Sequence, residues 1–230
     1  RDFVAELLFV ACLSGAHLSR FSEDWIFFTS QEAGFLELGD EVSTGSSLMP
    51  HKKNPDALEL VRGKGARLLG RLTGFVACLR SLPLAYDKDL QEDKEALFES
   101  LDTWDACLSI ATLVIQSARF DRERCGTASR QGFLNATELA QYLVSRGVAF
   151  RDAHEQVGRL VRAGISKGRE LHELSLDEIR SQAPDCGADV FEVLELESVL
   201  EQRQALGSAN PSLVRDEARR WLEELDSKPE

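Results

Sequence analysis

The residues best suited to chemistry lie in one short segment, residues 45–55, which is rich in glycine, serine and lysine. Lys52 and Asn54 place a cation close to an amide donor, and such a pair is suited to holding one carboxylate. From residue 51 to residue 71 six basic residues outnumber two acidic ones, although the whole chain carries a net charge of -12. This local reversal favours a small anionic ligand, but a solvated or interface-facing helix surface would show the same charge.

The segment reads GSSLMPHKKNP and resembles the signature GSSxMPxKxNP of the fumarase/aspartase superfamily. That superfamily includes fumarase, aspartase, adenylosuccinate lyase, argininosuccinate lyase and the delta crystallins. The resemblance implies an enzyme that removes a proton from the carbon next to a carboxylate. The reaction passes through a doubly charged aci-carboxylate, whose extra charge must be stabilised where it develops.

By the same resemblance, Ser46 is the general base, with Ser47 as the alternative, while Lys52 and Asn54 hold the substrate carboxylate. An ordinary hydroxyl is a very weak base at neutral pH, so Ser46 requires a stabilised alkoxide and the exclusion of water. A glycine-flanked loop that closes over the substrate would supply both. We expect Glu59 to orient a catalytic histidine from elsewhere in the full protein.

Each of these residues also has an ordinary structural interpretation. Ser46 and Ser47 would fit a simple turn, and Asn54 would fit a helix N-cap. Glu59 would fit a first-turn acid paired with Arg62. By the resemblance, the catalytic histidine lies in an N-terminal half that this chain lacks, so we expect the chain alone to be inactive. Four histidines are present, each of which we interpret as structural or exposed: His17, His51, His154 and His172.

A second run, YDKDLQEDKE at residues 86–95, resembles the pattern of argininosuccinate lyases and delta crystallins. By this resemblance Tyr86, Gln91 and Lys94 contact argininosuccinate, with Lys94 as the counter-ion of a substrate carboxylate. The alternative is a charged loop that caps the following helix. The implied activity is the elimination of fumarate from argininosuccinate to give arginine, with no cofactor and no metal.

The resemblance also bears on partners and on competing functions. It implies a homotetramer whose long helices pack in a central bundle and whose active sites are each built from several subunits. We expect the second and third long helices to lie in that bundle. Two alternatives stay open: a non-catalytic structural protein similar to the delta crystallins, and another lyase of the superfamily such as adenylosuccinate lyase.

Apolar periodicity predicts an all-α fold in which long helices are followed by a smaller helical domain. A first helix reaches residue 28, and residues 29–55 are irregular. A second helix runs to Arg80 with Asn54 as its N-cap and Pro55 at its first position, and a third covers residues 90–120. The predicted domains are residues 1–124, with the signature loop at 40–55, and residues 125–230. The second domain is predicted to contain helices at 135–146, 150–167, 175–182, 188–204 and 211–225, with a capping box formed by Ser175 and Glu178.

Composition narrows the functional classes further. Nucleic-acid binding needs a surplus of lysine and arginine, which a chain with a net charge of -12 lacks. The five cysteines are scattered and form no CxxC pair, which argues against a disulfide framework and a zinc site. The apolar runs are interrupted well short of the roughly 20 residues that a membrane span requires. No signal or lipidation motif is visible, so we expect a cytoplasmic protein without a membrane partner.

Overall fold

The computed structural model describes residues 1–45, 49, 53–80 and 82–227. Helices account for 71% of the chain and strands for only 4%, which confirms the predicted all-α class. The chain divides into two compact units, unit 1 from Arg1 to Cys125 and unit 2 from Gly126 to Glu230. The predicted domain boundary at residue 125 lies next to this division.

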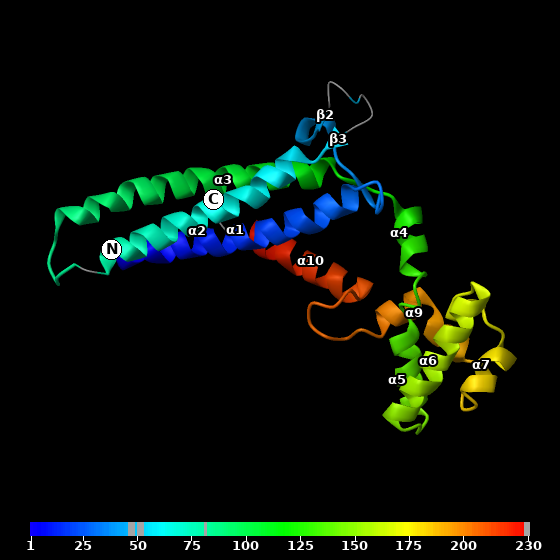
Figure 1. Cartoon of the computed structure of the whole chain (residues 1–230). Helices are drawn as coiled ribbons and strands as arrows, with labels where there is room; N and C mark the ends of the chain where they lie inside the picture. The colour runs from blue at the N-terminus through cyan, green and yellow to red at the C-terminus, as the bar shows by residue number, and fades with distance from the viewer. Residues whose placement is uncertain (46–48, 50–52, 81, 228–230) are drawn as a thin grey trace. The chain divides into compact units, whose positions relative to one another are not determined.

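Unit 1 is built from three long helices, α1 (Asp2–Thr29), α2 (Asp56–Leu79) and α3 (Asp93–Ser117). Each reverses the direction of the one before it, and the helices lie side by side (Figure 1). Only one face of α1 is buried, through Val4, Leu8, Ala11, Gly15 and Ser22. Other sides of α1 also carry apolar residues, which are exposed, among them Phe3, Val10 and Phe27.

Small residues let α1 and α2 approach each other closely. A Cβ added at Gly15 would lie 2.7 Å from Cδ1 of Leu68, and one added at Gly65 would lie 3.2 Å from the Gly15 carbonyl oxygen. On the other side, the indole N–H of Trp104 in α3 donates to the Ser14 hydroxyl at 2.7 Å. Backbone contact and this hydrogen bond together fix the relative position of the three helices.

The connection between α1 and α2 contains the predicted irregular segment, with two short strand pairs. Strand β1 (Leu36–Glu37) pairs with β4 (Arg119–Phe120), and β2 (Thr44–Gly45) pairs with β3 (Lys53–Asn54), both antiparallel. The 3₁₀ turn η1 (Asp40–Val42) lies between β1 and β2.

Two predicted helix boundaries are wrong. Asn54 is not the N-cap of α2, because it belongs to β3, where its backbone pairs with Thr44 of β2. Pro55 takes the N-cap position without a side-chain cap. The third helix is shorter than the predicted 90–120, since residues before it form the 3₁₀ turn η2 (Lys88–Glu92) and residues after it enter β4.

Among the described residues, one helix, Asp2–Phe28, is long and apolar enough to cross a membrane by length and composition. Counting apolar runs in the sequence excludes this helix because Glu6 and Ser14 interrupt them, whereas the continuous helix averages over both. The buried core helix of a globular unit meets the same test. Because α1 packs along α2 and against α3, we interpret it as a core helix of unit 1.

Unit 2 contains shorter helices around a core of its own. After α4 (Arg122–Ser129), which the sequence analysis did not predict, come α5 (Ala136–Ser145), α6 (Phe150–Lys167), the 3₁₀ turn η3 (Leu171–Glu173), α7 (Leu176–Gln182), α8 (Val190–Leu194), α9 (Leu196–Glu201) and α10 (Pro211–Asp226). The predicted helix at 188–204 is divided in two because Glu195 has extended backbone. Thirteen buried residues form one core cluster, including Leu139, Leu143, Leu160 and Ile179.

The predicted capping box of α7 is confirmed. The Ser175 hydroxyl accepts from the Glu178 N–H at 3.3 Å, and the Glu178 carboxylate accepts from the Ser175 N–H at 2.8 Å. Glu178 also binds the Lys167 ammonium at 2.6 Å and the Arg169 guanidinium. These contacts hold the pKa of the Glu178 carboxyl far below its ordinary value, with the Lys167 hydrogen bond as the largest cause.

Candidate functional site

Two predicted catalytic residues, Asn54 and Glu59, lie at one end of the three-helix unit. Asn54 and Glu59 belong to the described part of the chain, whereas Ser46 and Lys52 lie outside the described residues. Ser47, the alternative base, and His51 also lie outside them. The geometry of the signature segment is therefore known from its two flanks, strands β2 and β3.

Those flanks are held together by backbone pairing and by one lysine. The Lys53 ammonium donates to the Leu38 carbonyl at 2.6 Å and binds the Asp40 carboxylate at 2.7 Å. The hydrogen bond from Lys53, followed by its charge, lowers the pKa of the Asp40 carboxyl. The Thr44 hydroxyl donates to the Asp56 carboxylate at the start of α2. Both ends of the signature segment are thus anchored to neighbouring elements of unit 1.

Asn54 is half-buried, and Glu59 is exposed in the first turn of α2. The structural alternative for Glu59 holds in part: Glu59 is a first-turn acid of α2, but the Arg62 guanidinium binds Glu23 of α1. Glu59 therefore keeps an exposed carboxylate at the helix end that carries the signature segment. This position is compatible with contact to a group from outside the chain.

The three predicted substrate-binding residues form a hydrogen-bonded chain. The Lys94 ammonium donates to the Gln91 side-chain oxygen at 2.8 Å, and the Gln91 amide nitrogen donates to the Tyr86 hydroxyl. All three side chains are exposed. The chain presents a cation, an amide and a phenol to the same region, a set of donors suited to a carboxylate and a polar substituent.

This chain of side chains lies at the opposite end of α2 from Asn54. Turn η2 packs against the end of α2, where the Cys78 thiol lies 3.5 Å from the Asp89 carbonyl. Figure 1 shows β2 and β3 at one end of the three helices and the α2 to α3 connection at the other. The 24 residues of α2, at 1.5 Å each, separate the two ends by roughly 36 Å. No small molecule can contact both sets of residues within one copy.

An apolar groove of about 520 Å³ opens between α2, α3 and the η1–β2 segment. Val42, Val61 and Ile110 line it, and Asp56, Lys64 and Asp102 contribute charged groups. It lies beside the described flank of the signature segment.

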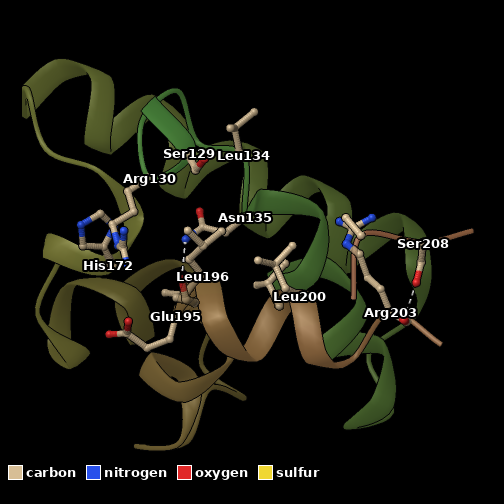
Figure 2. A pocket seen from close by; sticks show the side chains of 13 residues that line it. Ser129, Arg130, Leu134, Asn135, His172, Glu195, Leu196, Leu200, Arg203 and Ser208 are labelled. Atoms are coloured by element: carbon tan, nitrogen blue, oxygen red, sulfur yellow. Dashed lines mark hydrogen bonds between the residues drawn. The ribbon is translucent and has the colours of Figure 1, made fainter. Parts of the chain in front are cut away.

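A second cavity, of about 330 Å³, belongs to unit 2 and is drawn in Figure 2. Arg130 and Arg203 line it, but each is already paired with a carboxylate, Glu197 and Glu138 respectively. His172 also lines this cavity, whereas His17 and His154 are exposed. None of the predicted site residues contributes to it, so we assign it no part in the chemistry.

Comparison with known proteins supports this description. The family model described as Lyase matches residues 1–70, and the model described as Argininosuccinate lyase C-terminal matches residues 133–201. A solved EDDS lyase variant with bound fumarate has a TM-score of 0.85 and 26% identity over 98% of this chain. EDDS lyase in complex with formate gives 0.85 and 27% over the same share. The chain is therefore similar, over nearly its whole length, to lyases of the fumarase/aspartase type.

A class II fumarase from Schistosoma mansoni shares the fold of this chain, with a TM-score of 0.69 and 16% identity over 85% of the chain and 39% of the fumarase. The chain covers 47% of each EDDS lyase structure. The chain therefore spans about half the length of the EDDS lyase structures that it matches.

Sequence reasoning did not single out the residues that anchor the two ends. Lys53 occupies a variable position of the superfamily signature, and Asp93 lies inside the second run without a predicted role. The Asp93 side chain is nevertheless buried and ion-paired with Arg1, at the start of α1. A buried acid beside a lysine is visible only in the fold, although the charged run around it marks the right place.

Proposed function

We propose that this chain is part of an argininosuccinate lyase, which eliminates fumarate from argininosuccinate and releases arginine. The observation that carries the proposal is the hydrogen-bonded chain of Tyr86, Gln91 and Lys94, because these are the residues that the resemblance to argininosuccinate lyases assigns to the substrate. The family match at residues 133–201 supports the same choice of substrate.

The proposed roles follow from the chemistry of each group. The Ser46 oxygen removes the proton from the carbon next to a carboxylate, and Lys52 and Asn54 stabilise the resulting dianion. The carbon–nitrogen bond then breaks, its electron pair leaves with the guanidino nitrogen of arginine, and an acid from another part of the protein protonates that nitrogen. Lys94 binds a substrate carboxylate, while Gln91 and Tyr86 orient the substrate.

The proposed enzyme is a homotetramer with composite active sites. The length of α2 keeps Asn54 and Lys94 of one copy apart, so each proposed site combines residues of different copies. Large apolar side chains that are exposed on the three helices of unit 1 support such an assembly. We place α2 and α3 in the central bundle.

The direct test is the release of fumarate by the intact protein that contains this chain. Argininosuccinate, adenylosuccinate and malate are compared at equal concentrations, and fumarate is followed by its ultraviolet absorbance. We expect turnover of argininosuccinate alone. Activity confined to adenylosuccinate would overturn the substrate assignment, and a fully folded protein without activity towards any of the three would favour the structural role of a delta crystallin.

Two substitutions test the assigned roles. Ser46→Ala is expected to lower kcat by roughly 10²–10⁴-fold, the range for loss of a general base, with unfolding unchanged. Ser47→Ala is the matched control, and a larger loss in that variant would move the base to Ser47. Lys94→Met is expected to raise the KM for argininosuccinate more than it lowers kcat, because it removes a substrate contact.

A second candidate is a lyase that acts on the substrate of EDDS lyase, since those structures match the fold with a TM-score of 0.85. The run at residues 86–95 favours argininosuccinate over this alternative, because it resembles the argininosuccinate lyase pattern in particular. Including EDDS in the substrate comparison separates the two, since preferential turnover of EDDS would replace the proposed assignment.

A further inference from the structure

Asp93 is a buried acid at the first position of α3. It is only 5% exposed, yet no predicted role accounts for it. A carboxylate removed from water is costly unless it is paired and hydrogen-bonded. Here, one oxygen of Asp93 lies 2.9 Å from Nε of Arg1, and the other lies 3.4 Å from Nζ of Lys94. The acid therefore joins the beginning of α1 to a lysine that faces solvent.

Lys94 is the residue through which this acid reaches the candidate site. The Lys94 ammonium has two partners among the described residues, Asp93 at 3.4 Å and the Gln91 side-chain oxygen at 2.8 Å. The bond to Lys94 directs the oxygen of the Gln91 amide towards the ammonium, which leaves the amide nitrogen to donate to Tyr86. A fixed acid thus sets the orientation of three exposed side chains in sequence.

The side chains of Lys94, Asp93 and Arg1 differ in how freely they can move. The side chain of Lys94 is 52% exposed and has a long flexible stem, whereas the side chain of Asp93 is only 8% exposed. Asp93 is also the first residue of α3, which packs on α1 and α2. The Arg1 side chain, 32% exposed, holds the second oxygen of Asp93. The rigid acid therefore restricts the mobile cation, and a group that is restricted before binding loses less entropy when the ligand arrives.

We propose that Asp93 is a positioning residue that holds the Lys94 ammonium, and through it Gln91 and Tyr86, in the geometry that receives the substrate carboxylate. This inference rests on the proposed function, because it takes Lys94 as a substrate contact. Arg1 completes the arrangement by fixing Asp93 from α1. If Asp93 served only as a first-turn acid of α3, its removal would change stability and leave substrate binding alone.

The test is a double-mutant cycle on the intact protein, with steady-state kinetics on argininosuccinate. Asp93→Asn keeps the shape of the side chain and removes its charge. Glu95→Gln is the matched control, since Glu95 lies in the same helical turn, is exposed, and loses the same charge. We expect Asp93→Asn to raise KM by roughly tenfold, the size of one charge-assisted contact, with kcat nearly unchanged. Glu95→Gln should leave both constants as they are.

The cycle distinguishes positioning from stability. If Asp93 acts through Lys94, then Asp93→Asn adds little further increase in KM once Lys94→Met is present. Effects that multiply instead, or a lower unfolding temperature without any change in KM, would overturn the positioning role. A folded intact protein without turnover of argininosuccinate would overturn the proposed function and this inference together. Failure of the positioning role alone leaves that turnover in place, so the two failures can be distinguished.

Discussion

The two units are both helical, but they differ in where their large apolar side chains lie. Unit 2 directs Leu139, Leu143, Leu160 and Ile179 into one core, and each is fully buried. Unit 1 leaves a dozen large apolar side chains exposed on its three long helices: Phe3, Phe9, Val10, Leu13, Phe27, Leu60, Leu69, Val76, Phe98, Leu108, Leu113 and Ile115. Unit 2 also exposes ten large apolar side chains, half of them on α10, but those of unit 1 extend along all three of its long helices, and we infer that other surfaces cover them.

The same difference applies to function. Unit 1 carries every predicted site residue, α2 separates the described Asn54 from Lys94, and the exposed apolar surface of this unit is suited to contact with further copies. A soluble protein rarely leaves so much apolar surface exposed unless it serves an interface. Assembly would cover this surface and also bring the two ends of different copies together. Under the proposed function, one assembly would account for both the exposed apolar surface and the divided site.

The largest predicted effect follows from placing a charge on the exposed surface of unit 1. Leu69→Glu in α2 and Leu108→Glu in α3 should each dissociate the proposed tetramer, because an unpaired charge buried in an interface costs roughly 3–5 kcal/mol and the cost recurs in every copy. The mass of the intact protein, measured by light scattering after gel filtration, reports the assembly. Fumarate release should fall with the loss of tetramer.

The matched control is Ile165→Glu in unit 2, where the isoleucine is 63% exposed in α6. We expect this variant to keep the assembly and the activity. A full tetramer in both unit 1 variants would show that another surface forms the bundle.

The difference between the units also separates what the sequence predicts from what it cannot. For α7 in unit 2 a local signal is sufficient: the spacing of Ser175 and Glu178 marks the start of the helix, and the structure confirms both bonds of the cap. In unit 1, Asn54 has the same kind of cap signal before a proline, yet strand pairing with Thr44 displaces it from that position. The pairing of two short strands within the same connection outweighs the local capping preference of Asn54.

The candidate site also contains residues that the sequence predicts and residues that only the fold reveals. One motif connects Tyr86, Gln91 and Lys94, and their side chains are hydrogen-bonded to one another. The pair of Asp93 and Arg1 joins the beginnings of two helices that only tertiary packing brings together, so no spacing rule could reveal it. Ser46 and Lys52 stay predictions, because they lie outside the described residues.

A smaller effect is expected from opening a cavity in the closed core of unit 2. Leu143→Ala should lower the free energy of unfolding of that unit by about 2–5 kcal/mol, the usual range for a buried leucine. Val144→Ala is the matched control on the next residue of α5, which is 39% exposed, and it should change stability by less than about 0.5 kcal/mol. Hydrogen exchange of unit 2 peptides in the intact protein provides the measurement. Equal effects of the two variants would contradict the closed core.

The smallest predicted effect concerns the acid stability of unit 2. Because its cationic partners depress the pKa of Glu178 below the ordinary value of 4.5, this carboxylate stabilises the folded unit at every pH above that value. The contribution is lost as the pH falls below 4.5, since the unfolded chain then takes up a proton that the folded chain resists. Glu178→Gln should therefore destabilise unit 2 at neutral pH and flatten the loss of stability between neutral and acidic pH.

Glu155→Gln removes a more exposed ion pair with Arg159 and serves as the control, because such pairs contribute little. Identical acid profiles of the wild-type protein and Glu178→Gln, measured by hydrogen exchange of α6 and α7, would show that Glu178 does not tie these helices together. Unit 2 would then depend on its apolar core alone.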